Sequence, residues 1–220
     1  MREMRVTGKG QLSVKPDRIR LMMNLSELKK DYEKALEASA EMSAKLSEVF
    51  CGCGFAVEDL KTLSFNVDAQ YEGYNDKNGN WKQRFVGYRF SQSLKLEFPA
   101  DNERLGKVLY ALSKSGVNTE FRIQYTVADV EARRNELLGK AVSDAKEKAA
   151  VLANAAGVRL GEISRIDYSF GNADICSEPV MLRNMKVAEA CCDGSAGFGM
   201  NIVADDIQID DSVTVCFEMI

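Results

Sequence analysis

Six cysteines are the residues of this 220-residue chain with the most specific potential chemistry. Cys51-Gly-Cys53 and the adjacent Cys191-Cys192 could supply four thiolates to a zinc ion or a redox couple. Structural zinc sites usually separate paired cysteines by roughly two to four residues, and C-x-x-C is the usual redox arrangement. Because neither pair has this spacing, the sequence favours reduced, partly buried thiols, and we assign no metal ligand.

The chain contains no histidine, which removes the commonest general base. It also removes the usual activator of serine and cysteine nucleophiles and the imidazole metal ligand. The pairs Asp205-Asp206 and Asp210-Asp211 could hold a hard cation, but charges beside a strand more often discourage aggregation. We therefore expect no enzymatic activity, no catalytic residue and no cofactor.

Aromatic residues gather around a strong turn signal at positions 75–80, which has Asn78-Gly79 at its centre. Aromatic pairs across two strands stabilise a hairpin by ~0.2–1 kcal/mol each. Tyrosine and tryptophan are also favoured at the centres of protein interfaces. Hairpin packing and partner binding both remain open, and the candidate interface consists of Tyr71, Tyr74, Trp81, Phe85 and Tyr88.

Alternation of apolar and polar residues predicts the strands that position this cluster. Residues 61–71 and 81–98 alternate with the period of two that is typical of half-buried strands. Strands rise about 3.3 Å per residue, so the tip of this hairpin should extend past the body of the domain. The same alternation predicts further strands at residues 4–15, 18–28, 120–127, 163–170 and 207–217. Gly8 and Gly10 lie inside the first of these, which indicates a bulge or a close backbone contact.

Three helices are expected at residues 31–50, 101–116 and 129–156, where apolar residues recur at helical spacing. Asp31, Asp101 and Asp129 stand at the N-cap positions. The longest helix carries an alanine-rich stripe from Leu138 to Ala156, which would let its backbone lie close to its support. These elements predict an α+β fold with two layers, a mainly antiparallel sheet covered on one face by about three helices.

Composition and charge exclude several classes of protein. The chain is 45% apolar and 28% charged with a net charge of −4 and no basic block, so we expect no nucleic-acid partner. No apolar stretch approaches the ~20 residues of a membrane span. No signal peptide is visible, so we expect a cytoplasmic protein as written, or an extracytoplasmic one if a signal was removed. No linker is apparent, which favours one domain over residues 1–220, with an irregular insertion at 171–204.

Several motifs occur in an order and spacing that match a known family. The longest runs from Asp144 to Gly161, and the shorter ones are Val6-x-Gly8-x-Gly10, Pro16-Asp17, Leu60-x-Thr62 and Gly87-Tyr88. Together they resemble the SIMPL domain family, formerly DUF541, which includes YggE-like oxidative stress defence proteins and a periplasmic immunogenic protein.

The resemblance implies a two-layer α+β fold, no established enzyme activity and no cofactor. Members resemble binding or assembly proteins, some form large homo-oligomers, and many are exported. We therefore expect a self-associating, non-enzymatic protein linked to the stress response, with a possible protein partner. The alternatives are a small-molecule carrier and a thiol-based redox or metal-binding protein that uses Cys51 and Cys53 or the cysteines at 176–192.

Overall fold

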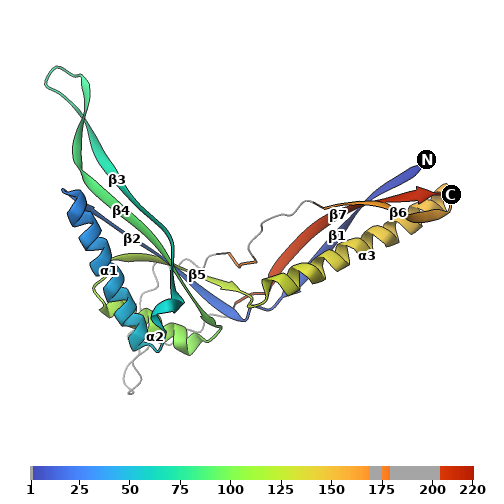
Figure 1. Cartoon of the computed structure of the whole chain (residues 1–220), viewed down its shortest axis with the longest axis horizontal. Helices are drawn as coiled ribbons and strands as arrows, with labels where there is room; N and C mark the ends of the chain where they lie inside the picture. Colours follow the sequence, from blue (N-terminus) through green and yellow to red (C-terminus); the bar gives the residue numbers. More distant parts are fainter. Residues whose placement is uncertain (1, 169–174, 179–203) are drawn as a thin grey trace. The chain divides into compact units, whose positions relative to one another are not determined.

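The computed structural model describes residues 2–168, 175–178 and 204–220 (Figure 1). These residues divide into two compact units. Unit 1 contains residues 2–17, 126–168, 175–177 and 204–220, and unit 2 contains residues 18–125 and 178. The described residues form three α-helices and two sheets, which confirms the predicted α+β class. Whether the two units behave as one domain stays a prediction.

Each unit combines strands with helices. Unit 1 is built from β1 (Glu3–Val14), α3 (Val130–Ala156), β6 (Leu160–Asp167) and β7 (Ile207–Met219). Unit 2 is built from β2 (Arg18–Lys29), α1 (Tyr32–Gly52), the short 3-10 helix η1 (Val57–Asp59), β3 (Leu60–Asn75), β4 (Trp81–Pro99), α2 (Asn102–Lys114) and β5 (Thr119–Thr126, whose last residue belongs to unit 1).

The strands form two sheets, where the sequence predicts one. Their orders are β1-β7-β6 in unit 1 and β3-β4-β2-β5 in unit 2. The division falls at Pro16-Asp17, because Pro16 has no N–H with which to continue a ladder. The N–H of Asp17 donates to the oxygen of Thr126 at 3.1 Å, and its carboxylate accepts from the N–H of Ala128 at 2.7 Å. The two halves of an apparently continuous alternating pattern therefore enter different sheets.

In unit 1, α3 lies directly on the backbone of β1. A Cβ atom on Gly8 would stand 2.0 Å from the oxygen of Ala141, and one on Gly10 would stand 2.2 Å from the oxygen of Leu137. Only glycine leaves room for this approach, so the predicted close backbone contact is confirmed. Ala141, Ala145, Ala149 and Ala153 are buried as expected, and Leu137 is buried too. Leu138 is only half-buried, Leu152 is 50% exposed, and Ala156, the predicted end of the stripe, is exposed.

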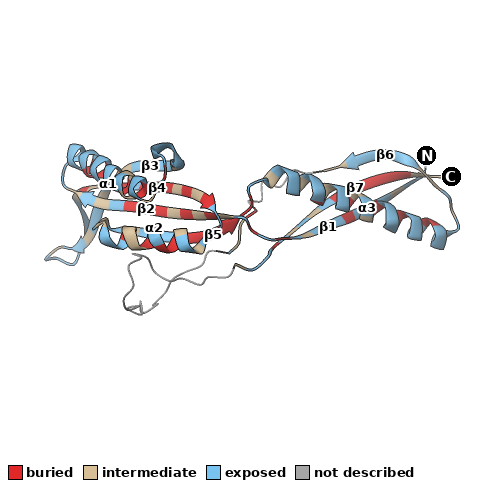
Figure 2. Cartoon of the chain, turned by 90° about the horizontal axis from the view of Figure 1, so that it is seen from below, coloured by how far each residue is buried: buried red, intermediate tan, exposed pale blue. Residues whose placement is uncertain are grey.

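In unit 2, the core lies between α1, α2 and the inner faces of β2 and β4, where the buried residues of Figure 2 concentrate. The strands pair antiparallel, so Leu21 faces Leu96 and Met23 faces Leu94. Gln92 interrupts this apolar face. Its Oε1 accepts hydrogen bonds from the hydroxyls of Ser39 (3.1 Å) and Ser43 (2.8 Å) of α1, so the buried amide is satisfied.

The helix caps follow the sequence at two of three positions. Asp101 accepts hydrogen bonds from the N–H groups of Glu103 and Arg104, and Asp129 accepts one from Ala132. Asp31 stands at the N-cap of α1 but caps no N–H. Its carboxylate instead forms an ion pair with the ammonium of Lys34, at 2.8 Å.

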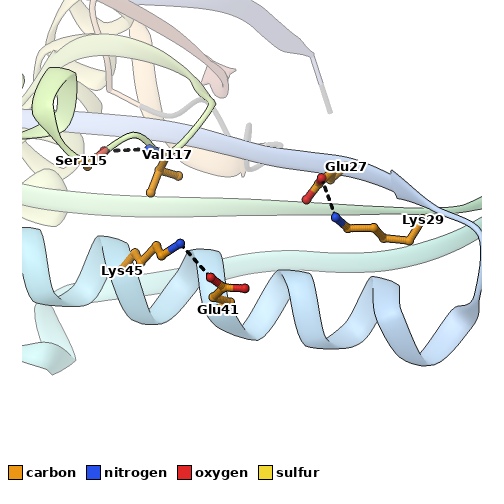
Figure 3. Close-up of polar contacts among 6 residues, drawn as sticks. All are labelled: Glu27, Lys29, Glu41, Lys45, Ser115 and Val117. Atoms are coloured by element: carbon orange, nitrogen blue, oxygen red, sulfur yellow. Dashed lines mark hydrogen bonds and ion pairs between the residues drawn. The ribbon is translucent and has the colours of Figure 1, made fainter.

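Exposed and half-buried polar contacts lie at the surface of unit 2. Figure 3 shows Lys29 paired with Glu27 and Lys45 paired with Glu41, both at 2.7 Å. It also shows the N–H of Val117 donating to the hydroxyl of Ser115 at 3.1 Å, just after α2. Exposed ion pairs of this kind contribute only ~0–1 kcal/mol each, so the buried layer carries the stability.

Candidate functional site

The apolar face of β3 is exposed, although its alternating sequence predicts a buried one. Leu63 is 52% exposed, Phe65 is 43% exposed and Tyr71 is 60% exposed. β3 is the edge strand of its sheet, and no residue along it is classed as buried. A bulge between Thr62 and Ser64 also displaces Leu63 from the alternation that the sequence suggests. Alternation identifies the side chains that share a face, but it does not show whether another layer covers them.

The tip of the β3–β4 hairpin is a two-stranded ribbon. β2 ends where Lys29 faces Tyr88, so beyond this point β4 pairs only with β3. The pairing continues to Asn75 and Trp81, and the ribbon extends past the end of β2 (Figure 1). The predicted long, projecting hairpin is therefore present in unit 2.

A compact turn closes this ribbon. One carboxylate oxygen of Asp76 accepts hydrogen bonds from the N–H groups of Asn78 (2.9 Å) and Asn80 (3.0 Å). The other oxygen pairs with the ammonium of Lys82 at 2.8 Å. The hydrogen bond from Lys82 and then those from the backbone hold the pKa of Asp76 below its usual value. Gly79 adopts the left-handed φ of +79° that the turn requires.

The register sorts the ribbon's side chains into two different faces. The neutral face carries, in facing pairs, Tyr71 and Phe85, Gly73 and Gln83, and Asn75 and Trp81. The indole of Trp81 lies over Gly73. A Cβ atom on Gly73 would stand only 2.0 Å from the ring, so a larger residue would not fit there. The charged face carries Glu72, Tyr74, Lys82 and Arg84. Arg84 pairs with Glu72 at 2.7 Å, and its guanidinium lies 6.0 Å from the ring centre of Tyr74.

Aromatic rings run in edge-to-face contact from the neutral face to the start of α1. Ring centres are 5.7 Å apart for Tyr71 and Phe85, 5.1 Å for Phe85 and Tyr88, and 5.5 Å for Tyr88 and Tyr32. Such contacts add ~0.5–1.5 kcal/mol each beyond simple burial. The structure thus brings together Tyr71, Phe85 and Tyr88, places Trp81 on the same face, and puts Tyr74 on the opposite one.

Sequence reasoning missed Tyr32, the residue that anchors this row to α1. The register shifts between the pairs Gln70–Gly87 and Tyr71–Phe85, because β4 has one extra residue there. This bulge brings Tyr88 onto the same face as Phe85, although the two residues are three positions apart. At the bulge Gly87 has a φ of +147°, and a Cβ there would stand 2.2 Å from the oxygen of Lys29. The available signal in the sequence was Gly87, since a glycine inside a strand often marks a bulge.

The cysteines do not form a common site in the described residues. Cys51 is exposed, Cys53 and Cys176 are half-buried, Cys216 is buried, and none of these four is in a disulfide. Burial raises the pKa of the Cys53 thiol, although Arg104 acts in the opposite direction. Within the described ranges no group of three potential ligands could hold a metal ion. Cys191 and Cys192 lie outside those ranges, as does most of the 171–204 insertion.

Two shallow surface grooves stand out among the described residues of unit 1. One of about 440 Å³ is mostly polar and includes Arg5, Ser212 and Thr214. The other, of about 490 Å³, runs along α3 and combines Val6, Val151 and Leu152 with charged residues of that helix. The described helices include none long and apolar enough to cross a bilayer.

Comparisons with known proteins connect this architecture to a family. The family model SIMPL, described as a protein of unknown function (DUF541), matches residues 4–217. The 26 kDa periplasmic immunogenic proteins of Brucella melitensis and Brucella abortus are each 30% identical over 161 residues. The match covers 73% of this chain and 64% of each relative, so the chain spans less than two thirds of their length. The chain therefore belongs to the SIMPL family.

Proposed function

We propose that this chain is a non-enzymatic, self-associating binding or assembly protein whose contact surface is the neutral face of the hairpin. The observation that carries the proposal is the exposure of its large aromatic side chains: 68% for Trp81, 60% for Tyr71 and 47% for Phe85. Apolar groups left in water on a projecting ribbon favour association, because their burial is the main driving force for contact between proteins.

The motif residues of the family support this proposal because several of them have structural roles. Gly8 and Gly10 admit α3, Asp17 ties the start of β2 to the end of β5, and Gly87 forms the bulge. Asp144 holds both α3 and β1, as described below. These structural roles account for the motif residues that carry the family resemblance. No catalytic role is needed to explain why they are present. The link to the stress response rests on the family resemblance.

Replacing two neutral-face aromatics tests the proposal. Trp81→Ala/Phe85→Ala should convert the assembly into monomers, measured by size-exclusion chromatography with light scattering at tens of micromolar chain. Tyr74→Ala is the matched control, because Tyr74 is an exposed aromatic of the same ribbon on the charged face. An unsubstituted chain that is strictly monomeric at this concentration would overturn the proposal, as would equal losses from both variants.

We also infer an extracytoplasmic location. The support is the name of the two Brucella relatives, which describes them as periplasmic. Fractionation of cells that express the chain from its own gene should place it outside the cytoplasm. Recovery in the cytoplasmic fraction alone would contradict this inference.

A thiol-based redox or metal-binding role is the second candidate, and it has less support. A reactive cysteine needs a lowered pKa, because the thiolate is the nucleophile, whereas burial raises the pKa of Cys53. We expect that alkylation of Cys53, followed against pH, will show no fast reaction of this thiol below about pH 8. A thiol that reacts rapidly near pH 6, or a metal that co-purifies with the chain, would restore this candidate.

A further inference from the structure

We propose that the neutral faces of two copies pack against each other around a two-fold axis, so that each hairpin docks on the same hairpin of the other copy. This inference rests on the proposed function and adds the identity and symmetry of the partner surface. In such an isologous contact, residues near the axis meet their own counterparts.

The separation of charge between the two faces favours self-contact. A charged group near a two-fold axis would face an identical charge, which is destabilising. The neutral face has no charged side chain among its six ribbon positions, and Gln83 and Gly73 form its middle pair. The charges lie on the other face, where Glu72 pairs with Arg84, and at the turn, where Asp76 pairs with Lys82. A second copy therefore meets no like charge on the neutral face.

A covering layer would stabilise the ribbon. Two-stranded ribbons are at best marginally stable in water and are stabilised by packing against another layer. Trp81 lies across Gly73 and fills the space that a side chain would occupy there. On the same face, beyond the pair Gly73 and Gln83, Tyr71 and Phe85 are in edge-to-face contact with each other. A second hairpin would supply the missing layer with side chains of the same kind.

The area available indicates how strong the contact should be. Aromatic side chains bury ~150–250 Å² each, so the exposed fractions of Trp81, Tyr71 and Phe85 amount to roughly 350 Å² per copy. Stable interfaces bury about 800 Å² per partner. The aromatic patch alone is therefore expected to give a weak dimer that dissociates in the micromolar range, and Phe65, farther along β3, would extend the contact.

Charge substitution at Gln83 tests the symmetry directly. Gln83→Lys and Gln83→Glu should each weaken dimerisation by about tenfold or more, because a like charge then faces itself near the axis. An equimolar mixture of the two variants should recover the association of the unsubstituted chain, measured by analytical ultracentrifugation. The matched control is Gln70→Lys and Gln70→Glu, on the reverse face of the same hairpin, where all these values should stay unchanged.

The outcomes separate this inference from the function on which it rests. A chain that is monomeric without any substitution overturns both. An assembly that is lost in Trp81→Ala/Phe85→Ala, but is not rescued by mixing the Gln83 variants, retains the proposed function and overturns the two-fold contact. Circular dichroism of the Gln83 variants, which is expected to match the unsubstituted chain, shows that any loss of association is not loss of folding.

Discussion

Asp144, on the face of α3 toward β1, binds two nitrogen atoms at once. Its Oδ2 accepts a hydrogen bond from the backbone N–H of Lys9 at 2.7 Å and pairs with the ammonium of Lys148 at 2.6 Å. The bond from Lys148, followed by that from Lys9, holds the pKa of Asp144 below its usual value. The carboxylate thus fastens the helix to the strand at the point where their backbones meet.

The lowered pKa predicts how the stability of unit 1 depends on pH. A carboxyl group whose pKa is lower in the folded chain adds stability above its unfolded pKa of about 3.9. That stability is lost as the pH falls through the folded value. Asp144→Asn should therefore reduce the loss of stability between about pH 5 and pH 2, measured by urea unfolding of unit 1.

Gln92 provides a second prediction for a single residue. Gln92→Leu should lower the free energy of unfolding by ~1–3 kcal/mol, because the hydroxyls of Ser39 and Ser43 lose their acceptor in a buried layer. Adding Ser39→Ala should recover part of this loss, since it removes one of the unsatisfied groups. If the double variant is no more stable than Gln92→Leu alone, the unsatisfied hydroxyl of Ser39 is not the source of the lost free energy of unfolding.

Among the elements, the contact of α3 with β1 was predictable and the exposure of β3 was not. Two glycines inside an alternating strand, together with an alanine stripe on a helix, indicate a close approach from the sequence alone. The exposure of Phe65 and Tyr71 depends on what covers β3, and that is settled by neighbours distant in the chain. The bulge beside Leu63 likewise depends on the partner strand, so the alternation of β3 alone could not locate it.

Gly8→Ala tests the contact between α3 and β1. Its new methyl group would collide with the backbone of α3, so the free energy of unfolding should fall by ~1–3 kcal/mol or more. Gly139→Ala is the matched control, because nothing lies within 4 Å of a Cβ at that position of α3. It should raise stability by ~0.5–1 kcal/mol, since alanine replaces glycine inside a helix. A Gly8→Ala chain as stable as the unsubstituted one would mean that the helix does not rest on the strand.

For the whole molecule, the sequence predicts a single domain and the structure has two compact units, each with its own buried layer. β1 and β2 have similar alternating patterns. The alternation therefore does not predict which of the two sheets each strand joins. The change at Pro16-Asp17 is visible in the sequence as a strand end. Its consequence, the transfer of the chain to another sheet, depends on the bonds of Asp17 to residues 126 and 128, more than 100 positions away.

Hydrogen exchange can determine whether the units unfold together. In Gly8→Ala, we expect faster exchange for the amides of β1 and β7, while the amides of β2 and β4 keep their protection because their core lies in the other unit. Equal loss of protection throughout would support the single cooperative domain that the sequence predicts. Mass spectrometry of peptides from the two units gives the comparison directly.

The carboxylate of Asp144 has a further consequence for how the protein behaves in concentrated solution. β1 is an edge strand, and the N–H of Lys9 that Asp144 occupies is a position where a foreign strand could dock. Protonation of Asp144 weakens this protection, so acid below about pH 4 should promote aggregation before unit 1 has lost its fold. Light scattering at falling pH, compared with the circular dichroism signal, would show turbidity first if this is correct. The solubility of the protein in acid would then depend on one side chain of α3, Asp144, which occupies a backbone N–H of the edge strand β1.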